Sequence, residues 1–170
     1  MEILELIKNR RSVRSFKKDP IPEKYLLSLK EALIWAPSAG NLQSRFFYFV
    51  FNEQIKQKLA QAALNQKYIA EAPLVVVGGV DYKAVAKYGE RGAKIFCQHD
   101  VAASIQNLLL LATELGLGTV WVGVFDSDKV AKLLKLPDHL FPVVLVPVGY
   151  AAKIPPAPSR IKPEAIKEIL

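Results

Sequence analysis

The sequence has very little of the residues from which disulfides and metal centres are built. It contains one cysteine, Cys97, and two histidines, His99 and His139, among 170 residues. One cysteine excludes a disulfide within the chain and suits a reducing compartment, and its simplest interpretation is a small buried hydrophobic residue. The histidines have no paired-ligand spacing, so we expect no protein-bound metal. Cys97 and His99 would share a face only in an extended segment, which argues against a cysteine–histidine nucleophile.

Long apolar runs are also missing. No stretch approaches the roughly 18 apolar residues that a membrane-spanning helix needs, and the N-terminus carries Glu2 and Glu5 where a secretory signal would be basic. We therefore expect a cytoplasmic protein without a membrane partner.

The charge is unbalanced, with 23 Lys and Arg against 16 Asp and Glu and a formal net charge of +7. Such a surplus favours anionic partners such as phosphorylated cofactors or nucleic acid. The lysines are spread along the chain without a long run, however, and no nucleic-acid-binding motif is present. We expect no nucleic-acid partner, although binding through the arginines at 10–14 stays open as an alternative.

Hydrophobic periodicity predicts helices and strands along one domain covering residues 1–170. Helices are expected over 2–9, from Pro22 to Pro37, after Asn52, over 67–72, over 100–115, after Asp126 or Ser127, and over 164–170. Strands are expected at 46–51, 74–77, 118–123 and 143–148. The strand at 46–51 is too apolar to face water on either side, and the one at 74–77 should be central. Pro147 should make the last strand irregular or place it near an edge. Asp100 is interpreted as a helix cap.

This order predicts an α+β fold with three layers, α/β/α, around a mixed and mainly antiparallel sheet. The proline-rich tail at about 154–170 has few residues that could form a core of their own. It is expected to be an extended C-terminal arm lying on a partner subunit.

Three short motifs lie outside the predicted core elements. Arg10-Arg11-Ser12-Val13-Arg14-Ser15-Phe16 places three guanidinium groups and two hydroxyls in one turn region, and such groups suit phosphate oxygens. A loop, Pro37-Ser38-Ala39-Gly40-Asn41-Leu42-Gln43, follows the second helix, and Pro158-Ser159-Arg160 lies in the tail.

The chain resembles the FMN-dependent nitroreductase family over nearly its whole length. The resemblance rests on these three motifs in this order, together with Tyr68–Pro73, Asp100–Leu108 and Gly116–Gly123. The resemblance implies an NAD(P)H-dependent oxidoreductase that passes hydride from NADH or NADPH through flavin N5 to nitroaromatic or quinone-like acceptors by a ping-pong mechanism. It also implies an intertwined homodimer with flavin sites at the interface. No acid–base pair is required, so no catalytic side chain is assigned.

The resemblance also assigns cofactor-binding residues. On the phosphate, ribityl and O2 side of the flavin it implies Arg10, Arg11, Ser12 and Arg14, with Ser159 and Arg160 at the phosphate. Against the flavin ring it implies residues from the other subunit: Pro37, Ser38, Ala39, Asn41 and Gln43. Beneath N5 it implies Trp121, Val122 and Gly123. Simpler roles stay open: Ser38 and Gln43 could close the loop, Asn41 could fill a left-handed position, Trp121 could be a core aromatic, and Gly123 could end a strand.

The chain departs from the family pattern at two places. Pro158 stands where many members have a lysine, so Arg10 or Lys162 would have to compensate at the phosphate. The connection between the strand at 74–77 and the helix at 100–115 lacks the helical excursion that often covers the site, which predicts an open pocket with little substrate selection. A specialised branch of the family (deiodinase, flavin-cleaving or dehydrogenase) and a non-catalytic FMN-binding protein remain as alternatives.

Overall fold

The computed structural model describes residues 2–167 and Ile169 of the chain. Its helices are α1 (Ile3–Asn9), α2 (Glu23–Ile34), η1 (Ala39–Asn41), α3 (Glu53–Ala62), α4 (Tyr68–Glu71), η2 (Ala86–Tyr88), α5 (Gly89–Arg91), η3 (Gly92–Phe96), α6 (Cys97–Glu114), α7 (Ser127–Leu134) and η4 (Pro163–Ala165). Its strands are β1 (Arg45–Val50), β2 (Leu74–Asp81), β3 (Gly118–Thr119) and β4 (Leu140–Gly149).

The strands form one sheet in the order β1-β2-β4-β3, and all three pairings are antiparallel. An isolated parallel bridge joins Ser12 to Thr119 at the β3 edge. β2 lies between β1 and β4, and Leu74 to Val80 are all buried. The apolar run at 74–77 is therefore a central strand, as predicted.

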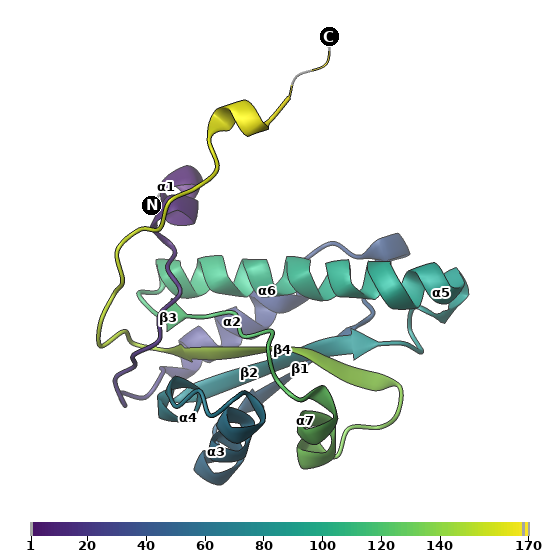
Figure 1. The fold of residues 1–170 in the computed structure, drawn as a ribbon, viewed down its shortest axis with the longest axis horizontal. Coiled ribbons are helices and arrows are strands. Elements are labelled where there is room, and N and C mark those ends of the chain that lie inside the picture. Colours follow the sequence, from purple (N-terminus) through teal and green to yellow (C-terminus); the bar gives the residue numbers. More distant parts are fainter. Residues whose placement is uncertain (1, 168, 170) are drawn as a thin grey trace.

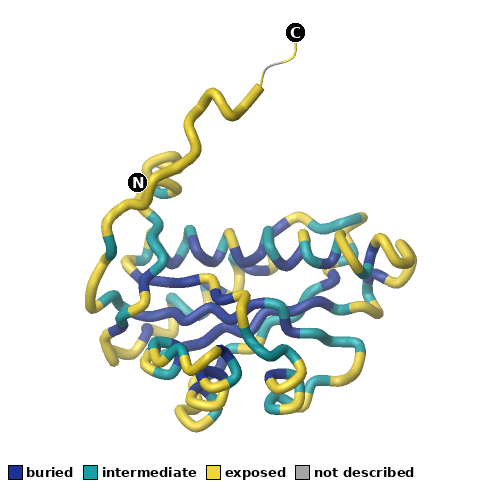
Figure 2. Tube along the Cα trace, viewed as in Figure 1, coloured by how far each residue is buried: buried dark blue, intermediate teal, exposed yellow. Residues whose placement is uncertain are grey.

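Helices cover both faces of this sheet, and Figure 1 shows the three layers. α6 and α2 pack on one face, where Leu29, Leu33, Ile105 and Leu108 join one buried cluster. α3, α4 and α7 cover the other face, and a second cluster lies between them and the sheet. Figure 2 shows burial concentrated in the sheet and the inner side of α6. The predicted α+β fold with three layers is confirmed.

Pro147 coincides with a gap in the pairing of β4 with β3, while the pairing of β4 with β2 continues through it. β3 pairs with β4 at Thr119 and Val148, and the contact resumes only at Val122 and Leu145. Continuing this register places Val120 opposite Pro147, which has no N–H to donate. The missing donor therefore accounts for the break in the ladder beside β4.

The prediction for the strand at 46–51 is wrong in one respect. β1 lies at an edge of the sheet, Phe46, Phe47 and Phe49 are only partly buried, and Tyr48 is 41% exposed. An apolar sequence indicates burial on both faces, but it carries no information on which strand ends up at the edge.

The C-terminal tail passes beside α1 and then extends away from the layers (Figure 1). α1 has no buried residue, and the tail carries Ile154, Ile161 and Ile166 with at least 70% of their surface exposed. The helix predicted over 164–170 is reduced to the single turn η4, followed by an extended Ile166; residues 168 and 170 of that prediction lie outside the described residues.

Candidate functional site

The basic stretch at 10–16 is an extended segment fixed to the sheet by its backbone. The Val13 amide donates to the Thr119 carbonyl at 2.8 Å, the Lys17 amide to Tyr150 at 2.8 Å, and the Ala152 amide to Ser15 at 2.9 Å. Val13 and Phe16 are buried, whereas Arg14 is exposed. The apolar side chains thus anchor the segment, and the arginine side of the motif stays accessible.

Gly118 makes this attachment possible. A Cβ at position 118 would lie 2.8 Å from Cγ2 of Val13, which is closer than real Cβ atoms approach. Glycine is therefore needed in β3 so that the basic stretch can lie directly against the strand.

Arginines from the two ends of the chain meet beside this segment. Burial lowers the pKa of Arg10, and the positive charges of Arg160 and Arg11 lower it further. Arg160 comes from the tail and is exposed. Like charges held near one another repel, and a bound anion would remove that cost. The charges of Arg10 and Arg160, from opposite ends of one chain, therefore act on one another, and their joint binding of a phosphate stays a prediction.

Arg11 has a clear local role. Its Nη1 donates to the carbonyls of Lys8 and Arg10, the latter at 2.9 Å, at the C-terminal end of α1. A cation at this end of a helix stabilises the unpaired carbonyls. A role of Arg11 toward a phosphate stays a prediction.

A cavity of about 320 Å³ lies beside the basic stretch, lined by Ser12, Arg14, Ser15, Lys153, Pro155 and Pro156. The predicted residues Ser12 and Arg14 thus share this cavity with the start of the tail. Lys153 was not among the predicted residues; it follows Tyr150 and Ala152, whose backbones bond to the basic stretch, and no local sequence pattern indicated it. Ser159 lies further along the tail and is exposed, and its carbonyl accepts from Arg160 at 3.1 Å.

The loop at 37–43 has an unusual backbone. Gly40, Asn41 and Gln43 adopt left-handed φ values of 54°, 55° and 52°. The Ser38 hydroxyl accepts the Gln43 amide at 3.0 Å, and Gln43 Nε2 donates to the Asn41 carbonyl at 3.4 Å. The simpler roles are therefore all present: Ser38 and Gln43 close the loop, and Asn41 fills a left-handed position. Left-handed non-glycine residues are a known feature of functional loops.

Asp100 anchors this loop, and its interpretation as a helix cap is wrong. Asp100 is 3% exposed and lies inside α6, not at its start. Its carboxylate accepts from the Ala39 amide at 2.9 Å, the Ser44 hydroxyl at 2.6 Å and the Ser44 amide at 3.3 Å. The loop is thus held from within by a carboxylate that sequence analysis had assigned to local capping.

Arg45 holds the same loop from the β1 side. Its guanidinium donates to the carbonyls of Ala36 at 2.7 Å, Pro37 at 2.9 Å and Ile34 at 3.1 Å. These bonds close the C-terminal end of α2 over the start of the loop. No local pattern singled out Arg45 from the other basic residues.

The segment Trp121-Val122-Gly123 leaves the sheet edge as an irregular strand. Val122 is buried and exchanges backbone hydrogen bonds with Leu145 at 2.9 and 3.0 Å. Trp121 is 41% exposed, so its interpretation as a core aromatic is wrong. Its Nε1 lies 3.6 Å from where a Cβ on Gly123 would be. An aromatic surface and an exposed backbone therefore lie side by side here.

The predicted residues form two groups at opposite ends of α6. The basic stretch pairs with β3, which follows the C-terminal end of α6, whereas Asp100 near its N-terminal end holds the 37–43 loop. Figure 1 shows α5 at one end of α6, and α1 and β3 at the other. Asp100 and the last turn are roughly 20 Å apart along the helix axis.

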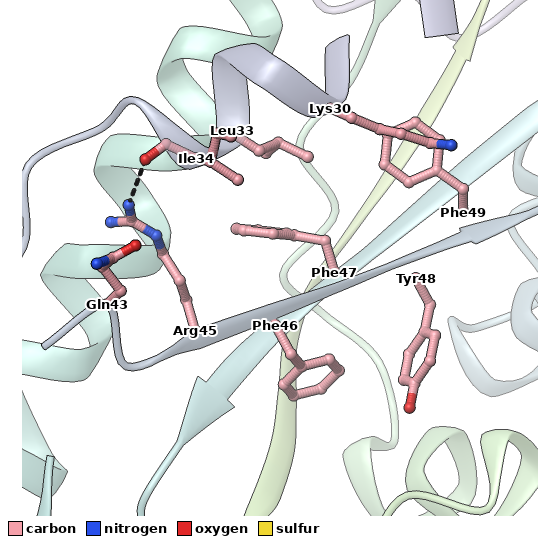
Figure 3. Close-up of a pocket in the computed structure, with 9 residues that line it drawn as sticks. All are labelled: Lys30, Leu33, Ile34, Gln43, Arg45, Phe46, Phe47, Tyr48 and Phe49. Carbon is pink, nitrogen blue, oxygen red and sulfur yellow. Dashed lines mark hydrogen bonds between the residues drawn. The ribbon is translucent and has the colours of Figure 1, made fainter. Parts of the chain in front are cut away.

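A cavity of about 430 Å³ lies between α2 and β1 (Figure 3). Leu33, Ile34 and Phe47 line its apolar part, Lys30 lies over the ring of Phe49 at 5.6 Å, and Gln43 and Arg45 lie at its other end. Of the predicted site residues, only Gln43 lines this cavity.

No helix in the described residues is long and apolar enough to cross a membrane.

Comparison with known proteins adds independent evidence. The model of the nitroreductase family matches residues 7–150. An NADH dehydrogenase of Thermus thermophilus is 32% identical, covering 85% of this chain and 84% of that protein. An NADPH-dependent oxidoreductase of Staphylococcus aureus is 28% identical over 89% of this chain and 65% of that protein. The structure of the NADPH:FMN oxidoreductase of Vibrio harveyi in complex with NAD+ superposes with a TM-score of 0.90 at 26% identity, covering 98% of this chain and 76% of that one. The match over most of the sequence confirms the resemblance: the chain belongs to the nitroreductase family.

Proposed function

We propose that the protein is an FMN-dependent oxidoreductase that takes hydride from NADH or NADPH and passes it to nitroaromatic or quinone-like acceptors in ping-pong order. The observation that carries this proposal is the grouping of Arg10, Arg11 and Arg160, drawn from both ends of a chain that belongs to the nitroreductase family. FMN supplies the hydride chemistry when bound, and the protein supplies binding and orientation.

The donor set fits a phosphate. Arg10 is partly buried with two like charges beside it, and the Ser12 hydroxyl lines the adjacent cavity. A phosphate dianion would relieve the repulsion among the arginines and accept charge-assisted hydrogen bonds. Lys153 at the same cavity is a candidate for the cation that Pro158 does not provide.

The ring side would be formed by Arg14 and the segment at 121–123. The Arg14 guanidinium is exposed at the cavity and offers a fixed positive charge to the polar edge of the flavin, which favours electron uptake. Trp121 and Gly123 offer an aromatic surface and a close backbone approach.

The 37–43 loop would come from a second copy of the chain. In one chain this loop lies at the opposite end of α6 from the basic stretch. A flavin bound at Ser12 and Arg14 would therefore meet the loop of a partner more readily than its own. Exposed apolar side chains on α1 and the tail, including Ile3, Leu4 and Ile161, support a homodimer that buries them.

The absorbance spectrum of the purified protein tests this proposal. We expect a yellow protein with stoichiometric flavin released as FMN, and anaerobic bleaching by NADH or NADPH followed by recovery on adding a quinone. A colourless protein that binds no added FMN would contradict the proposal. Flavin that neither nicotinamide bleaches would instead indicate a non-catalytic FMN-binding protein. A cytoplasmic location stays a prediction.

A further inference from the structure

A second, smaller cavity lies against the 37–43 loop on the side of α6. It has a volume of about 280 Å³ and is lined by Pro37, Ser38, Ala39, Phe96, His99, Asp100 and Ala103. Small-molecule sites commonly start at about 300 Å³ for drug-sized ligands. This cavity therefore suits a molecule with one ring.

The walls of this cavity are mainly apolar, with two polar side chains, Ser38 and His99, that can still donate a hydrogen bond. Pro37, Ala39, Phe96 and Ala103 supply apolar surface. The Asp100 carboxylate is occupied by the Ala39 and Ser44 donors, and the Ser38 hydroxyl already accepts from Gln43. His99 is exposed at the wall. Its imidazole can donate a hydrogen bond to an oxygen of a bound ring, as can the O–H of Ser38.

Neighbouring residues fix the Phe96 wall. Phe96 ends the π-helical segment η3, a rare geometry that recurs at functional sites. The Tyr88 ring meets it edge-on, with 5.4 Å between centroids and an interplanar angle of 87°. The hydroxyl end of Tyr88 lies against Gly40, where a Cβ would overlap it. Tyr88 therefore spans from Phe96 to the loop and sets the distance between them.

We propose that this cavity binds the electron acceptor, with a single-ring quinone or nitroaromatic packed on Phe96 and one of its oxygens accepting a hydrogen bond from His99. The inference rests on the proposed function, because the loop that lines the cavity is the one expected at the flavin. It replaces the expectation of an unselective open pocket with a site that prefers small rings.

The test uses the full chain loaded with FMN and two acceptors, 1,4-benzoquinone and the three-ring 9,10-phenanthrenequinone. His99→Leu should raise KM for benzoquinone about three- to tenfold, the effect of losing one hydrogen bond. His99→Gln, which keeps a donor, should restore most of it, and the matched variant of the other histidine, His139→Leu, should leave KM unchanged. Phe96→Ala should raise the ratio of kcat/KM for the large over the small quinone by at least about tenfold.

Direct binding separates this inference from the proposed function. Titration of the unmodified protein with 1,4-dihydroxybenzene should shift the NMR signals of the His99 ring and not those of His139, whether or not NAD(P)H reduces the flavin. Failure of NAD(P)H to bleach the flavin would count against the proposed function alone. The inference is overturned if the His99 signals do not move, if His99→Leu changes KM less than twofold, or if His99→Leu loses its FMN, since His99 would then serve the cofactor.

Discussion

Removal of the Asp100 carboxylate is the sharpest test of how the 37–43 loop is held. Asp100→Ala leaves three donors, the Ala39 amide, the Ser44 amide and the Ser44 hydroxyl, without their acceptor in a buried setting. The bonds at 2.9 and 2.6 Å are charge-assisted and contribute about 1.5–3 kcal/mol each, while the 3.3 Å bond is weaker. Burying the free carboxylate offsets part of this sum. We expect a loss of about 3–4 kcal/mol in the free energy of unfolding.

Two measurements check this value. Urea unfolding gives the free energy directly, and thermal unfolding should show a midpoint lower by about 6–16 °C for a chain of this size. Hydrogen exchange gives the local readout, because the Ala39 and Ser44 amides should lose protection while those in β2 keep theirs.

Matched variants make the comparison specific. Ser44→Ala removes only the hydroxyl and should cost about 1–2 kcal/mol. Asp100→Asn keeps an acceptor for Ala39 and should fall between the two. A loss below about 1 kcal/mol for Asp100→Ala, with unchanged exchange at Ala39 and Ser44, would refute the view that this carboxylate anchors the loop.

Three further predictions concern the cofactor, the thiol and the tail. Arg10→Ala should weaken FMN binding about ten- to a hundredfold in a fluorescence titration, while Lys17→Ala, nearby and outside the motif, should have little effect; equal effects would mean a diffuse basic surface. Burial raises the pKa of the Cys97 thiol above its ordinary value of 9.0. The stability that the protonated thiol contributes should therefore be present below pH 9.0 and decline as the pH rises further. In urea unfolding at graded pH, Cys97→Ala should make this decline shallower. If the stability of Cys97→Ala declined with pH as steeply as that of the unmodified protein, the thiol would be excluded as the cause of the decline. Deleting residues 155–170 should abolish both the dimer and bound flavin in sedimentation and absorbance measurements, whereas a truncated chain that keeps stoichiometric FMN would contradict the role of the tail.

Local sequence patterns were sufficient to predict the features that depend on a single helix or strand. The β-branched run at 74–77 indicated a central strand, the apolar sequence after Asp100 indicated a buried helix, and Pro147 indicated a break in the ladder. Asp126 could be named as a cap because its partner, the Lys129 amide, is three residues away. Each of these properties depends on neighbours in the sequence.

The features that were missed depend on distant partners. Asp100 bonds to Ala39 across 61 positions, and no spacing rule links them. β1 was expected to be covered on both faces because its residues are apolar, but strand order, which a single segment does not encode, places it at the edge. Trp121 is exposed although Val120 and Val122 on either side of it are buried, as alternate residues of an extended segment are. The motif resemblance named the segments of the candidate site, and the contacts that shape these segments became visible only in the fold.

The pairing of the basic stretch with the end of the sheet has a consequence for how the protein matures. Val13 and Lys17 are synthesised 106 and 133 residues before their backbone partners, Thr119 and Tyr150. At synthesis rates of about 5–20 residues per second, roughly 5 to 27 seconds pass before those partners exist. During that time the arginines belong to an unpaired segment, and closing so long a loop is an entropic cost that later contacts must offset. Nascent chains stalled before Tyr150 should therefore retain no flavin, and uptake of the cofactor should begin only once the segment around Tyr150 has been made.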